Sequence, residues 1–396
     1  MSIAPGETPE ERGQVMIDRA RAIAPLVAEA ASETERESRL PQRVVNAIVE
    51  TGLFKMLAPR ELGGSEADFR AYVLVAEAIG AADASTGWCV VQAGHAGFTM
   101  APRLPKEVAK EVFGAPEAAL AGGSGPVPGR ADEVEGGYIL NGSWDFASGC
   151  MHCSWFDARA YPWRDGKIVA NEAGASAVYS MAVPRKDVEI IEHWNVRGMR
   201  GTGSHRYVAK DVFVPRERTV EMFGSGGWAV GPMYRVPGLG AAHMAFTSVA
   251  LGAAGAMLDD FIQLAMTKTP GLSRQRLADS AAVQSMVARS RAKLRGARAF
   301  RNEAVALVWQ EATAGRVSAA ARAEVRLAGI HGIDAAVDVV ESVYRAAGTT
   351  AIFGESAFQR RFQDVHVMSQ QLFGRTAHYE NVGKLALGVD FDSGVL

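Results

Sequence analysis

One long segment without a charged side chain constrains the fold of this chain more than any other feature. From Val236 to Leu258 the sequence contains no Asp, Glu, Lys or Arg. A membrane-spanning helix needs a continuous, strongly apolar run of ~20 residues. This segment is instead rich in Gly and Ala, and it contains His243, Thr247 and Ser248. It therefore predicts a helix buried on all sides within a helical bundle, and not a membrane span.

Charge and cysteine content exclude several function classes. The chain has 42 Lys and Arg residues and 44 Asp and Glu residues, which gives a net charge of -2. This charge does not suit a protein that binds the phosphate backbone of nucleic acids. Three cysteines fit a reducing compartment better than a disulfide framework. The first residues show neither the basic start nor the apolar run of a secretory signal. We expect a cytoplasmic protein without a membrane or nucleic-acid partner.

The 396 residues divide into three blocks of different pattern. Apolar residues at helical spacing fill the first block, short β-rich runs closed by Gly and Pro fill the second, and long Ala-rich helical patterns fill the third, over 274–310 and 318–345. We expect an α+β fold. Its parts are an N-terminal helical domain (1–118), a middle β-barrel or sandwich domain (119–225) and a C-terminal four-helix bundle (226–396).

Several motifs occur in a characteristic order. ELGG at 61–64 precedes GGYILNGSW at 136–144, which leads into FASG at 146–149; GMRGTGS at 198–204 is followed by VFVP at 212–215. In this order and spacing, the chain resembles the acyl-CoA dehydrogenase superfamily over nearly its whole length. In detail it is more similar to that fold's flavin-dependent monooxygenase branch. Those proteins are oxygenase components of two-component systems, such as the 4-hydroxyphenylacetate and secosteroid hydroxylases.

The resemblance implies a flavin site at two of these segments. A flavin needs a hydrogen-bond partner near its N5 atom and a wall against its ring, and a short strand that ends in Ser-Gly can offer a hydroxyl without crowding. The implied support of N5 is Ser148. The implied flavin contacts are Trp144, Phe146, Ser148, Arg200, Thr202, Gly203, Ser204 and, at the phosphate end across a subunit boundary, Arg274. The alternative for 144–149 is a β-turn with two core aromatic residues. For 202–204 it is a loop between strands, and for Arg274 it is a charged helix face exposed to solvent.

The C-terminal segment separates two activities of the superfamily. In the similar dehydrogenases, a Glu removes the proton beside a thioester carbonyl, so a carboxylate is required there. Counted from Asp364, that position falls at about Leu372, and no Glu or Asp lies between Val365 and Tyr379. The sequence therefore argues against ordinary acyl-CoA dehydrogenation.

Histidines are the remaining candidates for a pocket base. The similar monooxygenases carry a His where this chain has Gln371, so His366 or His378 could substitute, or Gln371 could act as a neutral hydrogen-bonding group. The alternatives are a surface position for His366 and packing beside Tyr379 for His378. His95 lies in a Gly- and Ala-rich helical segment and could face the substrate or supply a proton near neutral pH; otherwise it is a core histidine bonded to a carbonyl.

The implied activity is that of an oxygenase component. Reduced flavin (FMN or FAD) from a separate flavin reductase would react with O2 through a C4a-hydroperoxyflavin and oxygenate a small aromatic or heteroatom-bearing substrate. The alternatives are an FAD-dependent acyl-CoA dehydrogenase or oxidase on the same fold, and a non-catalytic member that acts as a binding partner. The resemblance also implies a homotetramer. No metal is expected, because Cys150-Met151-His152-Cys153 lacks a further pair of ligands at zinc spacing.

Overall fold

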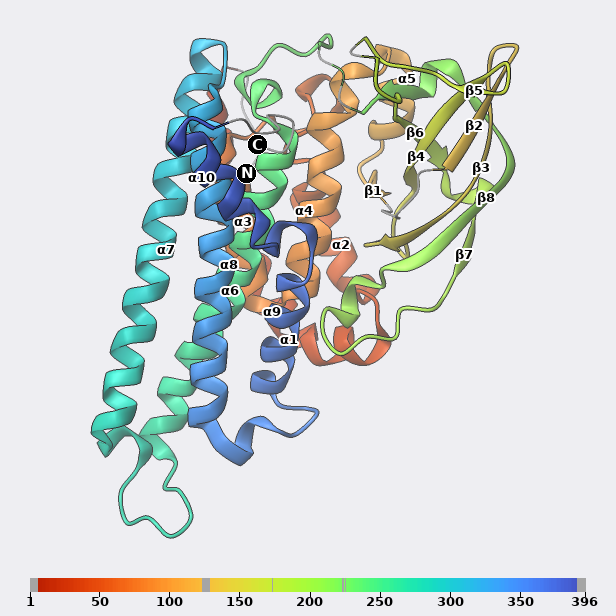
Figure 1. Cartoon of the computed structure of the whole chain (residues 1–396). Coiled ribbons are helices and arrows are strands. Elements are labelled where there is room, and N and C mark those ends of the chain that lie inside the picture. Colours follow the sequence, from red (N-terminus) through yellow and green to blue (C-terminus); the bar gives the residue numbers. More distant parts are fainter. Residues whose placement is uncertain (1–5, 123–128, 173, 223, 225, 390–396) are drawn as a thin grey trace.

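The protein consists of a helical part and a sheet part that lie side by side (Figure 1). The computed structural model describes residues 6–122, 129–172, 174–222, 224 and 226–389. The N-terminal helices are α1 (Pro9–Glu37), α2 (Gln42–Thr51), α3 (Phe69–Ala82), α4 (Ala84–Thr99) and α5 (Lys106–Phe113). The side chain of Asp83 caps α4 by accepting from the backbone N–H of Thr86. Trp88 and His95 are seven residues apart on α4, which is about two helical turns. Their side chains therefore lie on the same side of the helix.

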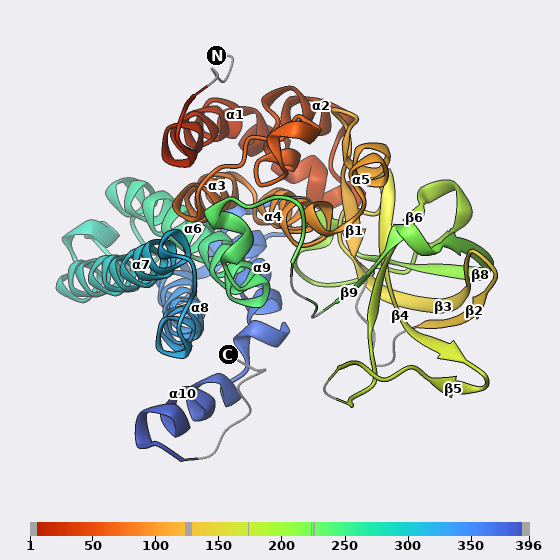
Figure 2. The ribbon, with the colours of Figure 1, turned by 90° about the horizontal axis from the view of Figure 1, so that it is seen from above.

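The middle of the chain forms one mixed sheet. Its strands follow the order β7-β8-β3-β2-β4-β6-β9, with β1 and β5 also paired to β4. Most neighbours are antiparallel, but β1 and β2 run parallel to β4. The strands are β1 (Leu120–Gly122), β2 (Gly129–Val134), β3 (Gly137–Ala147), β4 (Trp155–Arg164), β5 (Lys167–Ile168), β6 (Tyr179–Pro184), β7 (Glu189–Ile191), β8 (His205–Pro215) and β9 (Thr219–Glu221). The sheet faces the N-terminal helices through α4 and α5 (Figure 2).

Long helices follow the sheet and pack around α6. They are α6 (Gly238–Thr267), α7 (Ala281–Ala314), α8 (Ala319–Ala347), α9 (Ala357–Ser369) and α10 (Ala377–Leu387). Helix α6 contacts α3, α4, α7, α8 and α9. It is long and apolar enough to cross a membrane, but 94% of its most apolar stretch is buried inside the protein, as in a core helix. The α+β class and the helix–sheet–helix order predicted from the sequence are confirmed.

Helix α7 begins later than the sequence pattern predicts. Pro270 and Gly271 end the preceding segment, and a 3-10 turn at Leu277–Asp279 separates that segment from α7. The guanidinium of Arg276 pairs with Asp279 at 3.0 Å across this turn. Arg274 therefore lies in the connection between α6 and α7, and not in a helix, which corrects the predicted start of the helix at Arg274.

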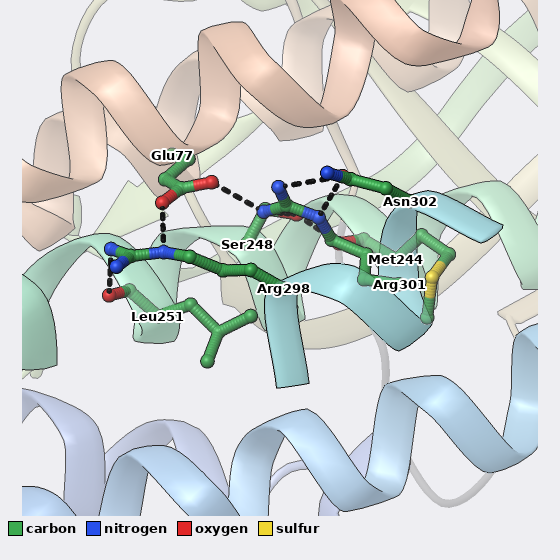
Figure 3. A network of polar contacts seen from close by, with 7 residues as sticks. All are labelled: Glu77, Met244, Ser248, Leu251, Arg298, Arg301 and Asn302. Atoms are coloured by element: carbon green, nitrogen blue, oxygen red, sulfur yellow. Dashed lines mark hydrogen bonds and ion pairs between the residues drawn. The ribbon is translucent and has the colours of Figure 1, made fainter. Parts of the chain in front are cut away.

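An ionic network around the buried Arg301 fixes α7 to the rest of the bundle (Figure 3). Glu77 on α3 accepts from Arg298 at 2.6 Å and from Arg301 at 2.5 Å. Arg301 is only 1% exposed, and it also donates to Ser248 on α6 at 3.2 Å. Because a buried charge is tolerated only when it is paired and hydrogen-bonded, this network defines how α3, α6 and α7 fit together.

Candidate active site

A bulge in β3 separates the two aromatic residues that were predicted to contact flavin. The register between β3 and β8 shifts between Trp144 and Ala147, and Phe146 has φ of 60°. A β-bulge of this kind redirects side chains that would share a face in a regular strand. Phe146 is consequently 56% exposed, whereas Trp144 is 1% exposed, stacks on Tyr207 and donates to the carbonyl of Arg159. Trp144 belongs to the core of the sheet, and only Phe146 is placed to meet a planar ligand.

Three hydroxyl groups form a continuous chain beyond this bulge. Trp88 Nε1 on α4 donates to Ser148 Oγ at 3.1 Å. Ser148 Oγ lies 2.7 Å from Ser204 Oγ, which lies 2.7 Å from Thr202 Oγ1. Thr202 Oγ1 in turn donates to the carbonyl of Met199 at 2.8 Å. The structure thus brings the two Gly-rich segments together, and it adds Trp88, which the sequence analysis did not single out.

The direction of the hydrogen bonds follows from the number of protons. Each hydroxyl has one proton to donate. Thr202 gives its proton to a carbonyl, so it can only accept from Ser204, and Ser204 can then only accept from Ser148. Ser148 therefore donates along the chain and accepts from Trp88. One lone pair of its oxygen is left to accept a hydrogen bond from a ligand.

The loop that carries Thr202 is held in place by two helices, α9 and α1. The carboxyl group of Asp364 on α9 accepts from the Met199 N–H at 2.5 Å. Arg200 donates to the carbonyl of Glu35 at 3.1 Å, near the end of α1. Its guanidinium therefore connects the loop to α1. Gly203 has φ of 50°, a left-handed conformation that favours glycine. Asp364 was used in the sequence analysis only for counting, and its role here is to anchor the loop.

His95 points toward the start of α6. Its Nε2 lies 3.1 Å from the carbonyl of Gly238 and must carry the ring proton, because a carbonyl only accepts. Burial lowers the pKa of His95 to about 4, against the opposing effect of the Gly238 bond. The ring is therefore neutral near pH 7, with Nδ1 as a hydrogen-bond acceptor. This corrects the expectation that His95 could supply a proton near neutral pH.

The three C-terminal candidates for a pocket group, Gln371, His366 and His378, have different surroundings. Gln371 Oε1 accepts from the backbone N–H of Phe373 and caps the turn after α9. His366 faces α8, where its Nε2 lies 3.8 Å from Glu341, and it packs on Phe362. His378 is 5% exposed, and its Nε2 lies 2.9 Å from the carbonyl of Leu372. Only His378 is fully inside the protein, so it is the one C-terminal histidine that an enclosed ligand could meet.

Two further predicted positions lie away from this cluster or serve it indirectly. Arg274 is exposed in the connection between α6 and α7, at the far end of these helices from the sheet (Figure 1). Cys150 Sγ donates to the carbonyl of Gly203 at 3.1 Å, and burial raises the pKa of Cys150 to about 11 and that of Cys153 to about 12. These thiols are therefore protonated and act as small core residues. No metal-ligand cluster occurs among the described residues.

The chain is similar to known proteins over most of its length. Residues 11–109 match the family "Acyl-CoA dehydrogenase, N-terminal domain", and residues 244–374 match "Acyl-CoA dehydrogenase, C-terminal domain". The chain is 32% identical over 362 residues to indole-3-acetate monooxygenase of Pseudomonas putida, covering 90% of this chain and 89% of that protein. It is 32% identical over 228 residues to the oxygenase subunit HsaA of a flavin-dependent monooxygenase from Rhodococcus jostii, covering 56% and 58% of the two chains. XiaF from Streptomyces sp., solved with FADH2 and glycerol, superposes with a TM-score of 0.86 at 26% identity over 96% of each chain.

The chain belongs to the acyl-CoA dehydrogenase superfamily. Within it, the chain is a flavin-dependent monooxygenase, an oxidoreductase of the oxygenase-component type. The resemblance drawn from the sequence motifs is thereby confirmed, as is the dependence on flavin.

Proposed function

We propose that reduced flavin binds with its N5 edge at Ser148 and its ring against Phe146. The observation that carries this proposal is the direction of the hydroxyl chain. Ser148 has already donated its proton toward Ser204, at 2.7 Å, and offers a lone pair. Reduced flavin carries a proton on N5, whereas oxidised flavin does not, so an acceptor at this position favours the reduced form. The exposed Phe146 beside it suits a planar ring. Thr202, Gly203 and Ser204 fix the acceptor, and Arg200 anchors their loop.

The protein's residues would position the reactants and exclude water. Bound reduced flavin supplies the reaction with O2 and the transfer of one oxygen atom to a small aromatic or heteroatom-bearing substrate. Trp88 and Phe246, stacked at 3.9 Å, form an apolar wall next to Ser148. A wall of this kind keeps water from diverting the oxidation to hydrogen peroxide. Neutral His95 would accept a hydrogen bond through Nδ1 and so orient a hydroxyl or N–H group. We do not assign catalytic roles to Gln371 and His366, and Trp144 supports the sheet.

The assembly and the supply of flavin are part of the same proposal. A separate reductase would deliver the reduced flavin to a cytoplasmic homotetramer, with domain bounds near residues 118 and 225. Helix α10 packs on α8 at the edge of the helical part, and its last residue, Leu387, is 80% exposed (Figure 2). This exposed end and the distant Arg274 would meet a second copy of the chain, where Arg274 would contact the phosphate end of that copy's flavin.

Flavin binding in two oxidation states tests the proposal. The dissociation constants of the purified protein for FMN and FAD would be measured with the flavins oxidised, and again with both reduced under anaerobic conditions. We expect tighter binding of the reduced form of the preferred flavin. Equal or tighter binding of the oxidised form would overturn the assignment of Ser148 as an acceptor for N5–H. Light scattering on the same samples gives the subunit count, and any value other than four would contradict the tetramer.

A further inference from the structure

Helix α8 holds a buried arginine that has no acidic partner among the described residues. In that part of the chain, three arginines are at most 5% exposed: Arg12, Arg301 and Arg326. Arg12 donates to backbone carbonyls, and Arg301 pairs with Glu77. Arg326, 2% exposed, has His243 as its hydrogen-bond contact, with Nη1 3.4 Å from Nδ1, and its Nε has no partner among the described residues. Since an unpaired buried cation is costly, an anion from outside the chain would remove a large penalty here.

Two histidines converge on the same place from other helices. The ring centroids of His243 on α6 and His378 on α10 are 5.5 Å apart, and the rings of His243 and Phe373 stack at 4.8 Å. The cluster is built to fit, because a Cβ added at Gly329 would lie 2.5 Å from His243 Nε2. Arg326 Cζ lies 5.8 Å from the centre of the Phe373 ring. Four separate elements thus enclose one small polar region.

The unpartnered atoms of this cluster are mostly donors. His243 accepts from Arg326 at Nδ1, so its proton is on Nε2, and that atom has no hydrogen-bond partner among the described residues. The ring also lies near the carbonyl of Phe373, but without hydrogen-bond geometry. Burial lowers the pKa of His243 well below its ordinary value, so the ring is neutral. His378 uses Nε2 at the Leu372 carbonyl and leaves Nδ1 buried without a partner.

An unbroken line of aromatic rings joins the cluster to the flavin-contact serine. Trp88 donates to Ser148 and stacks on Phe246 with ring centroids 3.9 Å apart. Phe246 is 6.0 Å from Phe373, and Phe373 lies against Arg326. An aromatic molecule lying along these rings would place one end near Ser148 and the other near the cationic cluster. The exposed Leu372, at 46%, marks where the covering segment between α9 and α10 meets solvent.

We propose that Arg326 and His243 bind the carboxylate of an aromatic substrate whose ring lies against Phe246 and Phe373. The inference rests on the proposed function, because it takes Ser148 as the flavin end of the same row of aromatic rings. One permanent cation beside one neutral imidazole with a free N–H suits a monoanion such as a carboxylate, which can accept from Arg326 Nε and His243 Nε2 together. The substrate class is therefore an aromatic acid with a short side chain.

Matched pairs of acids and amides test the charge directly. Binding of indole-3-acetate and indole-3-acetamide, and of phenylacetate and phenylacetamide, would be measured by calorimetry on the full chain, without flavin and with anaerobically reduced flavin. We expect the wild-type protein to prefer each acid by about tenfold or more, since a buried charge-assisted pair contributes over 1.4 kcal/mol. Arg326→Met should remove this preference by weakening acid binding more than amide binding. Arg322→Met is the control, because Arg322 lines a different cavity with Phe69 and Val236.

Each outcome decides the proposal. Equal binding of acid and amide by the wild-type protein, including no binding of either, would overturn it, as would an acid preference that survives Arg326→Met. His378→Gln is a second variant, and it should retain the preference for the acid, because neutral His378 has no free proton for a carboxylate. Loss of the preference in this variant would contradict the assignment of the anion to Arg326 and His243. An acid preference lost in Arg326→Met would stand even if the flavin tests above failed, so the two proposals fail separately.

Discussion

The indole nitrogen of Trp88 lies 3.1 Å from the hydroxyl oxygen of Ser148, and this bond joins helix α4 to the end of strand β3. The bond fixes the aromatic wall relative to the hydroxyl that we propose as the flavin contact. It also occupies one of the two lone pairs of the Ser148 oxygen, because an indole N–H can only donate.

Removing the Ser148 hydroxyl should uncouple the reaction. In Ser148→Ala, product formed per reduced flavin should fall at least about tenfold, with a matching rise in hydrogen peroxide, because one oriented hydrogen bond to the flavin is lost. Both yields would be measured in single turnovers. Ser180→Ala is the matched control, since Ser180 has the same 7% exposure and lies within β6. An unchanged product yield in Ser148→Ala would refute the role.

Reversing the hydroxyl chain should weaken the preference for reduced flavin. Thr202→Val removes the group that takes the Ser204 proton, so Ser148 can then accept from Ser204 and donate to a ligand. We expect the ratio of oxidised to reduced flavin dissociation constants to fall about three- to tenfold, the value of one ordinary hydrogen bond. The midpoint potential of bound flavin should move to a more negative value. Thr202→Ser retains the hydroxyl and should behave like the wild type; a shift in that variant equal to the one in Thr202→Val would contradict the mechanism.

The stability of the protein should depend on pH through Asp364. Burial, helped by the charge of Asp83, raises the pKa of Asp364 to about 8. The unfolded chain ionises this group near pH 4, so folding takes up a proton between those values, and stability falls as pH rises from about 4 to about 8, by up to ~1.4 kcal/mol per pH unit. Asp364→Asn keeps an oxygen for the Met199 N–H and loses this slope. Denaturant midpoints at pH 5 to 8 check it, with the exposed Asp338→Asn as control; parallel curves for wild type and Asp364→Asn would contradict the assignment.

Breaking the Glu77 network should destabilise the bundle more than replacing it. Glu77→Ala leaves Arg301 buried without its carboxylate and should cost about 3–5 kcal/mol. The double variant Glu77→Leu with Arg301→Met removes both buried charges and should recover most of that loss. Chemical denaturation of both variants measures the difference. If the single variant is as stable as the wild type, the network in Figure 3 does not fix α7 as argued.

The sequence pattern predicts elements better than it predicts which face a side chain takes. The charge-free segment becomes the buried α6, and Ser318 caps α8 where the pattern places a helix start. The burial of Trp144 and the exposure of Phe146 could not be predicted, because the bulge between them depends on the register with β8 and has no local sequence signal. The start of α7 was wrong because a 3-10 turn interrupts a continuous helical pattern.

The candidate site was predicted where it is contiguous in sequence and missed where distant segments meet. Ser148 and the 202–204 loop come from two motifs that the resemblance names together. The sequence around Trp88 gives no sign of a functional role, since an aromatic residue in an apolar helix is usually part of the hydrophobic core. His243, Arg326 and His378 come from three helices, and only packing reveals that the arginine lacks an acid. Burial without a partner is a property of the folded chain and not of any one segment.

The return of oxidised-flavin absorbance after mixing tests the central claim most directly. The protein holding anaerobically reduced FMN, and separately FAD, would be mixed with oxygenated buffer in a stopped-flow instrument. If the protein shields its flavin, oxidised flavin should return much more slowly than it does from free reduced flavin, with at least one of the two cofactors. The return should also be slower in the wild-type protein than in Ser148→Ala. Reoxidation at the rate of free flavin with both cofactors would contradict the account.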